Sequence, residues 1–227
     1  MKHKSKKISF VASKSAGKVS GIFVRPDRAD SLLVFAHGAG AGMQHRFMEA
    51  AALGLADNGI ATLRYQFPYM EKRSGRPDPK PILYSTVRAA IAKAKELAPD
   101  LPLIAGGKSM GGRMTSMAAS EESLEGVRGI VFFGFPLHPP GKNTTDRSEH
   151  LFQVTIPMLF LQGTRDTLAD LTLLRPVCQK LGKNTTLHVV EGADHSFHML
   201  KRSGRTDAEV LGELCANTRE WAKELDR

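Results

Sequence analysis

The stretch LIAGGKSMGGRM, from Leu103 to Met114, places one serine among four glycines directly after an apolar run. The frame around Ser109 is G-K-S-M-G, so Gly107 and Gly111 stand two positions before and after it. At the junction of a strand and a helix, this frame can hold a nucleophile on a sharp, strained turn. Glycines suit such a turn because side chains at these two positions would collide with neighbouring elements. A turn that only permits close packing fits the same frame, so the surrounding sequence must decide.

The rest of the chain alternates short apolar runs with segments of helical spacing. The first two runs flank a Lys/Ser/Gly turn and predict a hairpin. The later runs are apolar throughout and each precedes a helix, which indicates a parallel sheet covered on both faces. We expect strands at 8–12, 21–26, 32–36, 60–67, 101–105, 129–136, 158–161 and 185–190, and helices at 43–57, 82–98, 110–120, 168–181 and 206–225. The predicted fold class is α/β, with a mostly parallel eight-stranded sheet, helices on both faces and little or no cap.

The composition, 227 residues of which 41% are hydrophobic, is typical of one globular domain. We expect residues 1–19 to hold a basic tail and the first strand, and residues 20–227 to form the remainder of that domain. The formal net charge is +9, but apart from the N-terminal MKHKSKK the basic residues are spread along the chain. We therefore expect this cluster to be a solvated tail rather than a nucleic-acid arm.

Several classes of protein are disfavoured by what the chain lacks. No run of about 20 apolar residues predicts a membrane span, and no apolar segment after the basic N-terminus predicts a signal peptide. The two cysteines, Cys178 and Cys215, match no metal-ligand spacing. They are expected to be reduced thiols, as in a cytoplasmic protein.

A serine hydroxyl needs a base to become a good nucleophile, and the base needs an orienting acid. His195, in EGADHSF just beyond the last predicted strand, is the best-placed base, and His198 is its rival. Asp166, in LQGTRD after the preceding strand, is the best-placed acid, whereas its rival Asp170 lies deeper in the predicted helix. Each residue alone has a structural interpretation, such as a helix cap for Asp166. Together, at the carboxyl ends of parallel strands and in the order Ser109, Asp166, His195, they predict a nucleophile–acid–histidine triad.

A fourth loop, HGAG, follows the strand at 32–36. Acyl transfer requires preorganised N–H donors for the developing oxyanion, and we assign these to the backbone of Met110 and Ala39. A P-loop is excluded, because G-x-x-x-x-G-K-[ST] requires a glycine where the chain has Pro102. No metal-ligand cluster is present, so we expect neither metal nor cofactor. The candidate pocket residues are His37, Gly38, Tyr69, Lys108 and His138.

The segments HGAG, GGKSMGGR, FFGFPLHPPGK, LQGTRD and GADHSF together resemble the α/β-hydrolase superfamily, near the dienelactone hydrolases. More narrowly, the chain resembles the hydrolase-like group named after a testis-expressed protein and a subunit of the NSL chromatin complex. The resemblance extends from about Gly21 onward and implies Ser109, Asp166 and His195 as the triad. True dienelactone hydrolases use cysteine as the nucleophile, so serine at position 109 argues against a lactone substrate.

The predicted function is that of a serine hydrolase which cleaves a small ester through an acyl-enzyme, with a small-molecule substrate and no membrane partner. Thioester or peptide cleavage by the same triad is an alternative. Another is a binding or scaffold protein that keeps the hydrolase fold and uses its basic surface for a partner, with nucleic acid disfavoured. The sequence predicts no oligomeric state.

Overall fold

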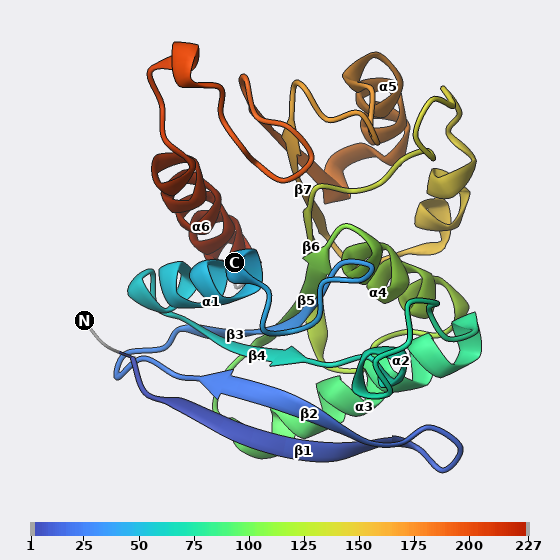
Figure 1. Cartoon of the computed structure of the whole chain (residues 1–227), viewed down its shortest axis with the longest axis vertical. Coiled ribbons are helices and arrows are strands. Elements are labelled where there is room, and N and C mark those ends of the chain that lie inside the picture. Colours follow the sequence, from blue (N-terminus) through green and yellow to red (C-terminus); the bar gives the residue numbers. More distant parts are fainter. Residues whose placement is uncertain (1–2, 226–227) are drawn as a thin grey trace.

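The apolar runs of the sequence form one eight-stranded sheet in the computed structural model, which describes residues 3–225 (Figure 1). The strand order is β1-β2-β4-β3-β5-β6-β7-β8. Strand β2 pairs antiparallel with β1 and β4, and the remaining neighbours are parallel. The predicted fold class is therefore confirmed. The strands are β1 (Ser5–Ser13), β2 (Gly17–Val24), β3 (Ser31–Ala36), β4 (Ile60–Tyr65), β5 (Leu103–Lys108), β6 (Val127–Phe133), β7 (Met158–Gly163) and β8 (Thr185–Val190).

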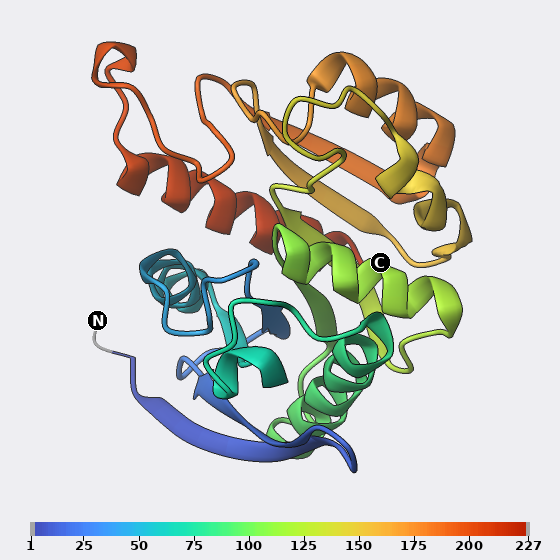
Figure 2. The ribbon, with the colours of Figure 1, turned by 45° about the vertical axis from the view of Figure 1, so that its right-hand side comes forward.

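Helices cover both faces of this sheet. Figures 1 and 2 show α1 and α6 on one face and α3, α4 and α5 on the other. In residues 3–225, three 3₁₀ helices lie in the connections. The helices are α1 (Arg46–Asp57), α2 (Pro68–Glu71), α3 (Lys80–Leu97), α4 (Met110–Glu121), η1 (Asp146–Gln153), α5 (Leu171–Leu181), η2 (Gly182–Asn184), η3 (Lys201–Ser203) and α6 (Asp207–Glu224).

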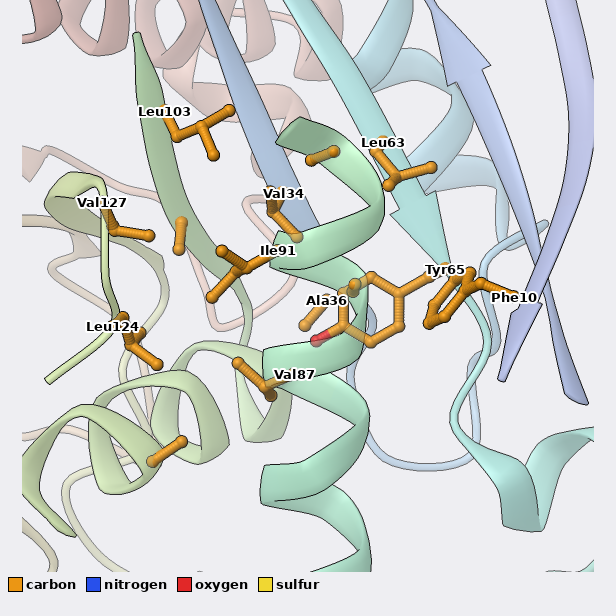
Figure 3. Packing of buried hydrophobic residues seen from close by; sticks show 14 of the residues in the cluster. Phe10, Val34, Ala36, Leu63, Tyr65, Val87, Ile91, Leu103, Leu124 and Val127 are labelled. Atoms are coloured by element: carbon orange, nitrogen blue, oxygen red, sulfur yellow. The ribbon is translucent and has the colours of Figure 1, made fainter. Parts of the chain in front are cut away.

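The central strands are buried on both sides, which explains why their sequences are apolar without alternation. Every residue of β3 is buried. Its Leu33 packs in the cluster with α1 and α6, whereas Val34 packs in the cluster with α3 and α4. Figure 3 shows Val34 on the side of the sheet that faces Val87 and Ile91 of α3. This two-sided packing gives the loops at the ends of the strands a rigid base.

The N-terminal basic segment departs from the prediction. From Ser5 on it is not a tail, because Lys6 and Lys7 are exposed residues of β1 that pair with β2. Successive side chains of a strand point to opposite faces, and both lysines are exposed because they lie at the start of the edge strand of the sheet. Met1 and Lys2 lie outside the described residues, and the expected division after residue 19 falls inside β2.

Two further boundaries differ for local reasons. The helix predicted from residue 43 begins at Arg46, because His45 is its N-cap and its Nδ1 accepts a hydrogen bond from the Phe47 N–H. The loop after β4 contains the short helix α2, which starts with Pro68 at its first position. Proline is tolerated there because the first N–H groups of a helix have no partner within it. Over residues 3–225, no helix combines the length and apolarity that a bilayer crossing requires.

Candidate active site

The site is built where the topology of the sheet reverses. Strands β3 and β5 are neighbours, although β4 lies between them in the sequence and on the other side of β3. The loops that follow β3 and β5 therefore face each other at the carboxyl edge of the sheet, where ligands bind in open α/β sheets. A Cβ atom added to Gly38, in the first loop, would lie 3.7 Å from the Cβ of Ser109, in the second.

Ser109 joins β5 to α4 in a strained conformation, with φ 51° and ψ −116°. A positive φ is unfavourable for a residue with a side chain and persists only where the surrounding structure imposes it. The Ser109 N–H donates a hydrogen bond to the Phe133 carbonyl at 3.1 Å. A Cβ atom at Gly107 or at Gly111 would lie 2.4 Å from the Ala36 carbonyl oxygen. The flanking glycines are thus required by backbone that passes directly beside the turn.

Three side chains from separate loops form a continuous hydrogen-bond chain. The Ser109 Oγ lies 2.8 Å from His195 Nε2, and His195 Nδ1 lies 2.7 Å from Asp166 Oδ2. With Nδ1–H donating to the carboxylate, Nε2 is free to accept the hydroxyl proton of Ser109. The Asp166 side chain is fully buried, while that of His195 is 22% exposed. The structure therefore brings together all three residues that we predicted as a triad.

Asp166 has two further partners, a backbone N–H of the kind that its interpretation as a cap suggested and a side chain that the sequence did not indicate. Its Oδ2 also accepts from the Gln162 side chain, and its Oδ1 accepts from the Leu168 N–H at 2.8 Å. Gln162 is itself buried in β7, and its Oε1 accepts from the Phe135 N–H at 3.0 Å. A polar residue inside an otherwise apolar strand was the available signal, because such a group is rarely buried without a hydrogen-bonding task.

The two rival residues have other roles. Asp170 does not lie deeper in a helix, because α5 begins only at Leu171. Asp170 is its N-cap and accepts from the Thr172 N–H at 2.8 Å, as capping aspartates do. His198 is exposed and pairs with Asp207 at 2.9 Å, at the start of α6.

The electrostatic surroundings of Ser109 are positive. The serine stands at the N-terminus of α4, where the first N–H groups of the helix point outward. The preceding residue, Lys108, donates from its ammonium to the His195 carbonyl oxygen at 2.6 Å. Burial lowers the pKa of Lys108 to about 8, and the negative charges of Asp166 and Asp194 oppose that shift.

A cavity of about 190 Å³ opens beside the serine. Of the five candidate pocket residues, Gly38 and Lys108 line it, and His37, Tyr69 and His138 are not part of its wall. The α1 side of the wall was not predicted, because helix periodicity does not show which end of a helix faces a site. The complete lining is Gly38, Ala39, Ala41, His45, Phe47, Met48, Lys108, Ser109, His195 and Ser196.

His37 supports the loop after β3 from below. It is fully buried, its Nδ1 donates to the Gly38 carbonyl at 2.8 Å, and its Nε2 accepts from the Phe67 N–H at 3.1 Å. This pattern requires the neutral ring, and burial lowers the pKa of His37 to about 4. His37 therefore fixes the loop and does not face the cavity.

The other two candidates also bind backbone groups. The hydroxyl oxygen of the buried Tyr69 accepts from the Gly40 N–H at 3.2 Å. The Nε2 of His138 accepts from the Asp170 N–H at 3.1 Å, which ties the loop after β6 to the start of α5. Tyr69 thus reaches the loop that we expect to hold an oxyanion donor, although from behind.

The two proposed oxyanion donors are available. Within residues 3–225, neither the Met110 N–H nor the Ala39 N–H has a hydrogen-bond partner, and Ala39 lines the cavity. Among these described residues there is also no group of three or more His, Cys, Asp or Glu side chains that could hold a metal ion.

Comparisons with known proteins agree with this architecture. Residues 29–223 match the family described as an alpha/beta hydrolase domain. A dienelactone hydrolase from Anabaena variabilis ATCC 29413 is 22% identical with a TM-score of 0.74, and the alignment covers 99% of each chain. An α/β serine hydrolase without lid from Xanthomonas campestris is 20% identical with a TM-score of 0.74, over 97% of this chain and 96% of that one.

A third structure, the esterase domain of a Rhodothermus marinus protein, is 14% identical with a TM-score of 0.72, over 97% of this chain and 98% of that chain. At these identities, the likeness shows a shared fold. The expected resemblance to α/β hydrolases, with dienelactone hydrolases among them, is confirmed. The narrower likeness to the testis-expressed and NSL-subunit group stays a prediction.

Proposed function

The chain belongs to the alpha/beta hydrolase domain family, and on that premise we propose that it is a serine hydrolase that cleaves small esters through an acyl-enzyme. The hydrogen-bond chain from Ser109 through His195 to Asp166 is the observation that carries the proposal. A strained, partly exposed serine that donates to a neutral imidazole, itself oriented by a buried carboxylate, has the arrangement of an activated nucleophile.

In the proposed mechanism, Ser109 Oγ attacks the ester carbonyl carbon while His195 Nε2 takes the hydroxyl proton. The tetrahedral intermediate collapses, the bond to the alkoxy oxygen breaks, and the imidazolium returns its proton to the leaving alcohol. A water molecule then attacks the acyl-serine with the same proton transfers, and the acid product leaves. Asp166 keeps the imidazole in the Nδ1–H tautomer and stabilises the imidazolium.

The developing oxyanion is assigned to the N–H groups of Met110 and Ala39. Both N–H groups lack another partner in the described structure, and the position of Met110 at the start of α4 adds the positive end of the helix dipole. The loop that carries Ala39 is held by Tyr69 and by His37, so that this donor is preorganised rather than recruited.

The substrate is proposed to be a small molecule with a short acyl group. The cavity beside Ser109 is only about 190 Å³, and apolar atoms of Phe47 and Met48 form part of its wall. Thioesters and amides would use the same proton transfers, so they are competing substrates rather than competing sites. We also propose a cytoplasmic location, since Cys178 and Cys215 are free thiols, as a reducing compartment would leave them.

A series of p-nitrophenyl esters with acyl chains from acetyl to decanoyl tests this function. We expect kcat/KM to be highest for the short chains and to fall once the acyl group exceeds the cavity. Ser109→Ala should abolish turnover, whereas the exposed Ser123→Ala should leave it unchanged as a matched control. Absence of turnover with every ester, together with rapid cleavage of matched thioesters, would move the assignment to a thioesterase.

A further inference from the structure

The side chain of Lys108 occupies a defined site beside the nucleophile. Its ammonium donates to the carbonyl oxygen of His195 at 2.6 Å. It also lies 5.5 Å from the ring centroid of Phe197 and 5.9 Å from that of Phe47. Both separations are within the range of a cation–π interaction. The loop after β8 that carries His195 and Phe197, residues 191–200, is called the histidine loop. The ammonium thus contacts the histidine loop twice and α1 once.

The two aromatic rings are themselves arranged around this charge. Phe47 and Phe197 stack with their centroids 6.0 Å apart and their planes 16° apart. Phe197 is buried and has a φ of 62°, in the left-handed region that side chains disfavour. A strained residue of this kind is held only where several contacts fix it at once. The contacts of Phe197 with Phe47 and with the Lys108 ammonium therefore hold the histidine loop two residues from His195.

Gly134, directly after β6, leaves the room that this arrangement needs. A Cβ atom there would lie 3.0 Å from the Lys108 Nζ, 3.4 Å from the His195 carbonyl oxygen and 3.5 Å from the His195 Cε1. The ammonium and the imidazole consequently pack against the same point of the sheet. A side chain at position 134 would crowd the ammonium, and the φ of 74° there also disfavours any residue other than glycine.

The main chain of His195 has little other support. Within residues 3–225, the Lys108 ammonium is the one hydrogen-bond partner of the His195 backbone, whose own N–H has none. The loop on either side is tied by the Asp194 carboxylate, which accepts from the Ser196 N–H at 2.8 Å and from the His198 N–H at 2.9 Å, and by the Ala193 carbonyl, which accepts from the Arg165 N–H at 2.9 Å. These bonds do not involve the His195 main chain itself, so its direct tie to the serine turn is the Lys108 side chain, which starts one residue before Ser109.

We propose that Lys108 is a positioning residue. Its ammonium couples the histidine loop to the turn between β5 and α4 that carries Ser109, and so holds the imidazole of His195 at hydrogen-bond distance from Ser109. This inference rests on the proposed function. Lys108 acts through His195 and does not contact the reacting atoms. Since a displacement of about 1 Å from reacting geometry can cost about 100-fold in rate, loss of this one contact should be visible in kcat.

The first test replaces Lys108 with methionine, which keeps the length and apolar stem of the side chain but removes the donor and the charge. With an uncharged acetyl ester, we expect Lys108→Met to lower kcat by about 10- to 100-fold, with KM changed by less than about threefold. The rate at which a fluorophosphonate labels Ser109 should fall by the same factor. Lys183→Met, at an exposed lysine in η2, is the matched control and should match the wild type.

Chemical rescue separates the charge from general packing. In Lys108→Cys, alkylation with 2-bromoethylamine rebuilds a side chain of lysine length with a terminal ammonium, and alkylation with 1-bromopropane builds the same length without it. We expect the first to restore most of the rate and the second to restore little. Treated wild type is the control, because Cys178 and Cys215 are buried. The comparison also remains informative if Lys108→Met folds poorly.

An NMR measurement without substrate completes the test. The proton between His195 Nδ1 and Asp166 gives a low-field NMR resonance, which we expect in the wild type and expect to broaden or shift in Lys108→Met at an unchanged melting temperature. Equal labelling rates and an unchanged resonance in the variant would overturn the proposal. So would a change confined to the KM of anionic esters, which would make Lys108 a substrate contact. A wild type that no fluorophosphonate labels would instead refute the proposed function, and the NMR comparison would still decide the role of Lys108.

Discussion

Gly111→Ala places a side-chain atom directly against backbone beside the serine turn. The added Cβ atom would lie 2.4 Å from the Ala36 carbonyl oxygen and 2.6 Å from both the Ala36 carbonyl carbon and the His37 carbonyl oxygen. All three are backbone atoms of β3 and the loop after it, so no side-chain rotation can relieve the contact. Ordinary van der Waals contact begins near 3.4 Å, and the two loops must therefore separate by about 1 Å.

The magnitude follows from two opposing effects. Overpacking a dense region costs about 1–3 kcal/mol, and a contact between backbone atoms belongs at the upper end of that range. Replacing glycine by alanine in a helix returns up to about 1 kcal/mol. We expect a net loss of about 2 kcal/mol in unfolding free energy, or about 4–8 °C in melting temperature for a chain of this size. The displacement moves Ser109 from His195, and kcat should fall by about 100-fold.

The assay compares melting temperature and ester turnover with those of Gly212→Ala. Gly212 is exposed in α6, and a Cβ atom added there meets nothing within 4 Å. This control should gain about 0.5–1 kcal/mol in stability without a change in kcat. If Gly111→Ala melted and turned over ester like the wild type, the close approach of Ala36 would not be what fixes the serine turn.

Two other perturbations test the supporting groups. Asp166→Asn should keep the fold but lower kcat by about 10⁴-fold, because the amide stabilises the wrong imidazole tautomer. Asp170→Asn should retain both activity and the α5 cap, since asparagine caps as well as aspartate. If steady-state kinetics gave the reverse result, the roles of the two aspartates would be exchanged. For His37, burial holds the folded-state pKa at about 4, below the ordinary 6.5, so its contribution to stability is complete above pH 6.5 and is lost as the pH falls toward 4. When the pH is lowered from 7 to 4.5, denaturant titration should show that the unfolding free energy of the wild type falls by about 2 kcal/mol more than that of His37→Gln. An equal fall in both proteins would contradict a buried, neutral His37.

The central strands could be predicted from the sequence because burial on both faces leaves continuous apolar runs. Their ends were less predictable where polar residues continue a strand, as Lys6 and Lys7 do in β1 and Lys108 does in β5. Helix starts depended on the capping residue rather than on periodicity. Asp170 has the residue type that caps prefer, but His45 does not, so the beginning of α1 could be found only from the structure.

The candidate site could be located because its residues follow strands that end at one edge of the sheet. Ser109, Asp166 and His195 needed only their order and their positions after strands. Their supporting contacts are of another kind: the ammonium of Lys108 reaches a carbonyl 87 residues away, and Gln162 in β7 joins Asp166 to the loop after β6. Such contacts depend on how loops fold over the sheet, which hydrophobic patterns do not specify.

Covalent labelling of the intact protein with a fluorophosphonate decides whether Ser109 is an activated nucleophile. The reagent forms a stable phosphonyl-serine only at a hydroxyl that a nearby base activates. We predict one adduct, located on Ser109 by mass spectrometry, with no labelling of Ser109→Ala and labelling of His195→Ala slowed by at least about 10⁴-fold. Both variants should melt like the wild type. A folded wild-type protein that acquires no adduct, or acquires it at another residue, would contradict the assignment of Ser109 as the nucleophile.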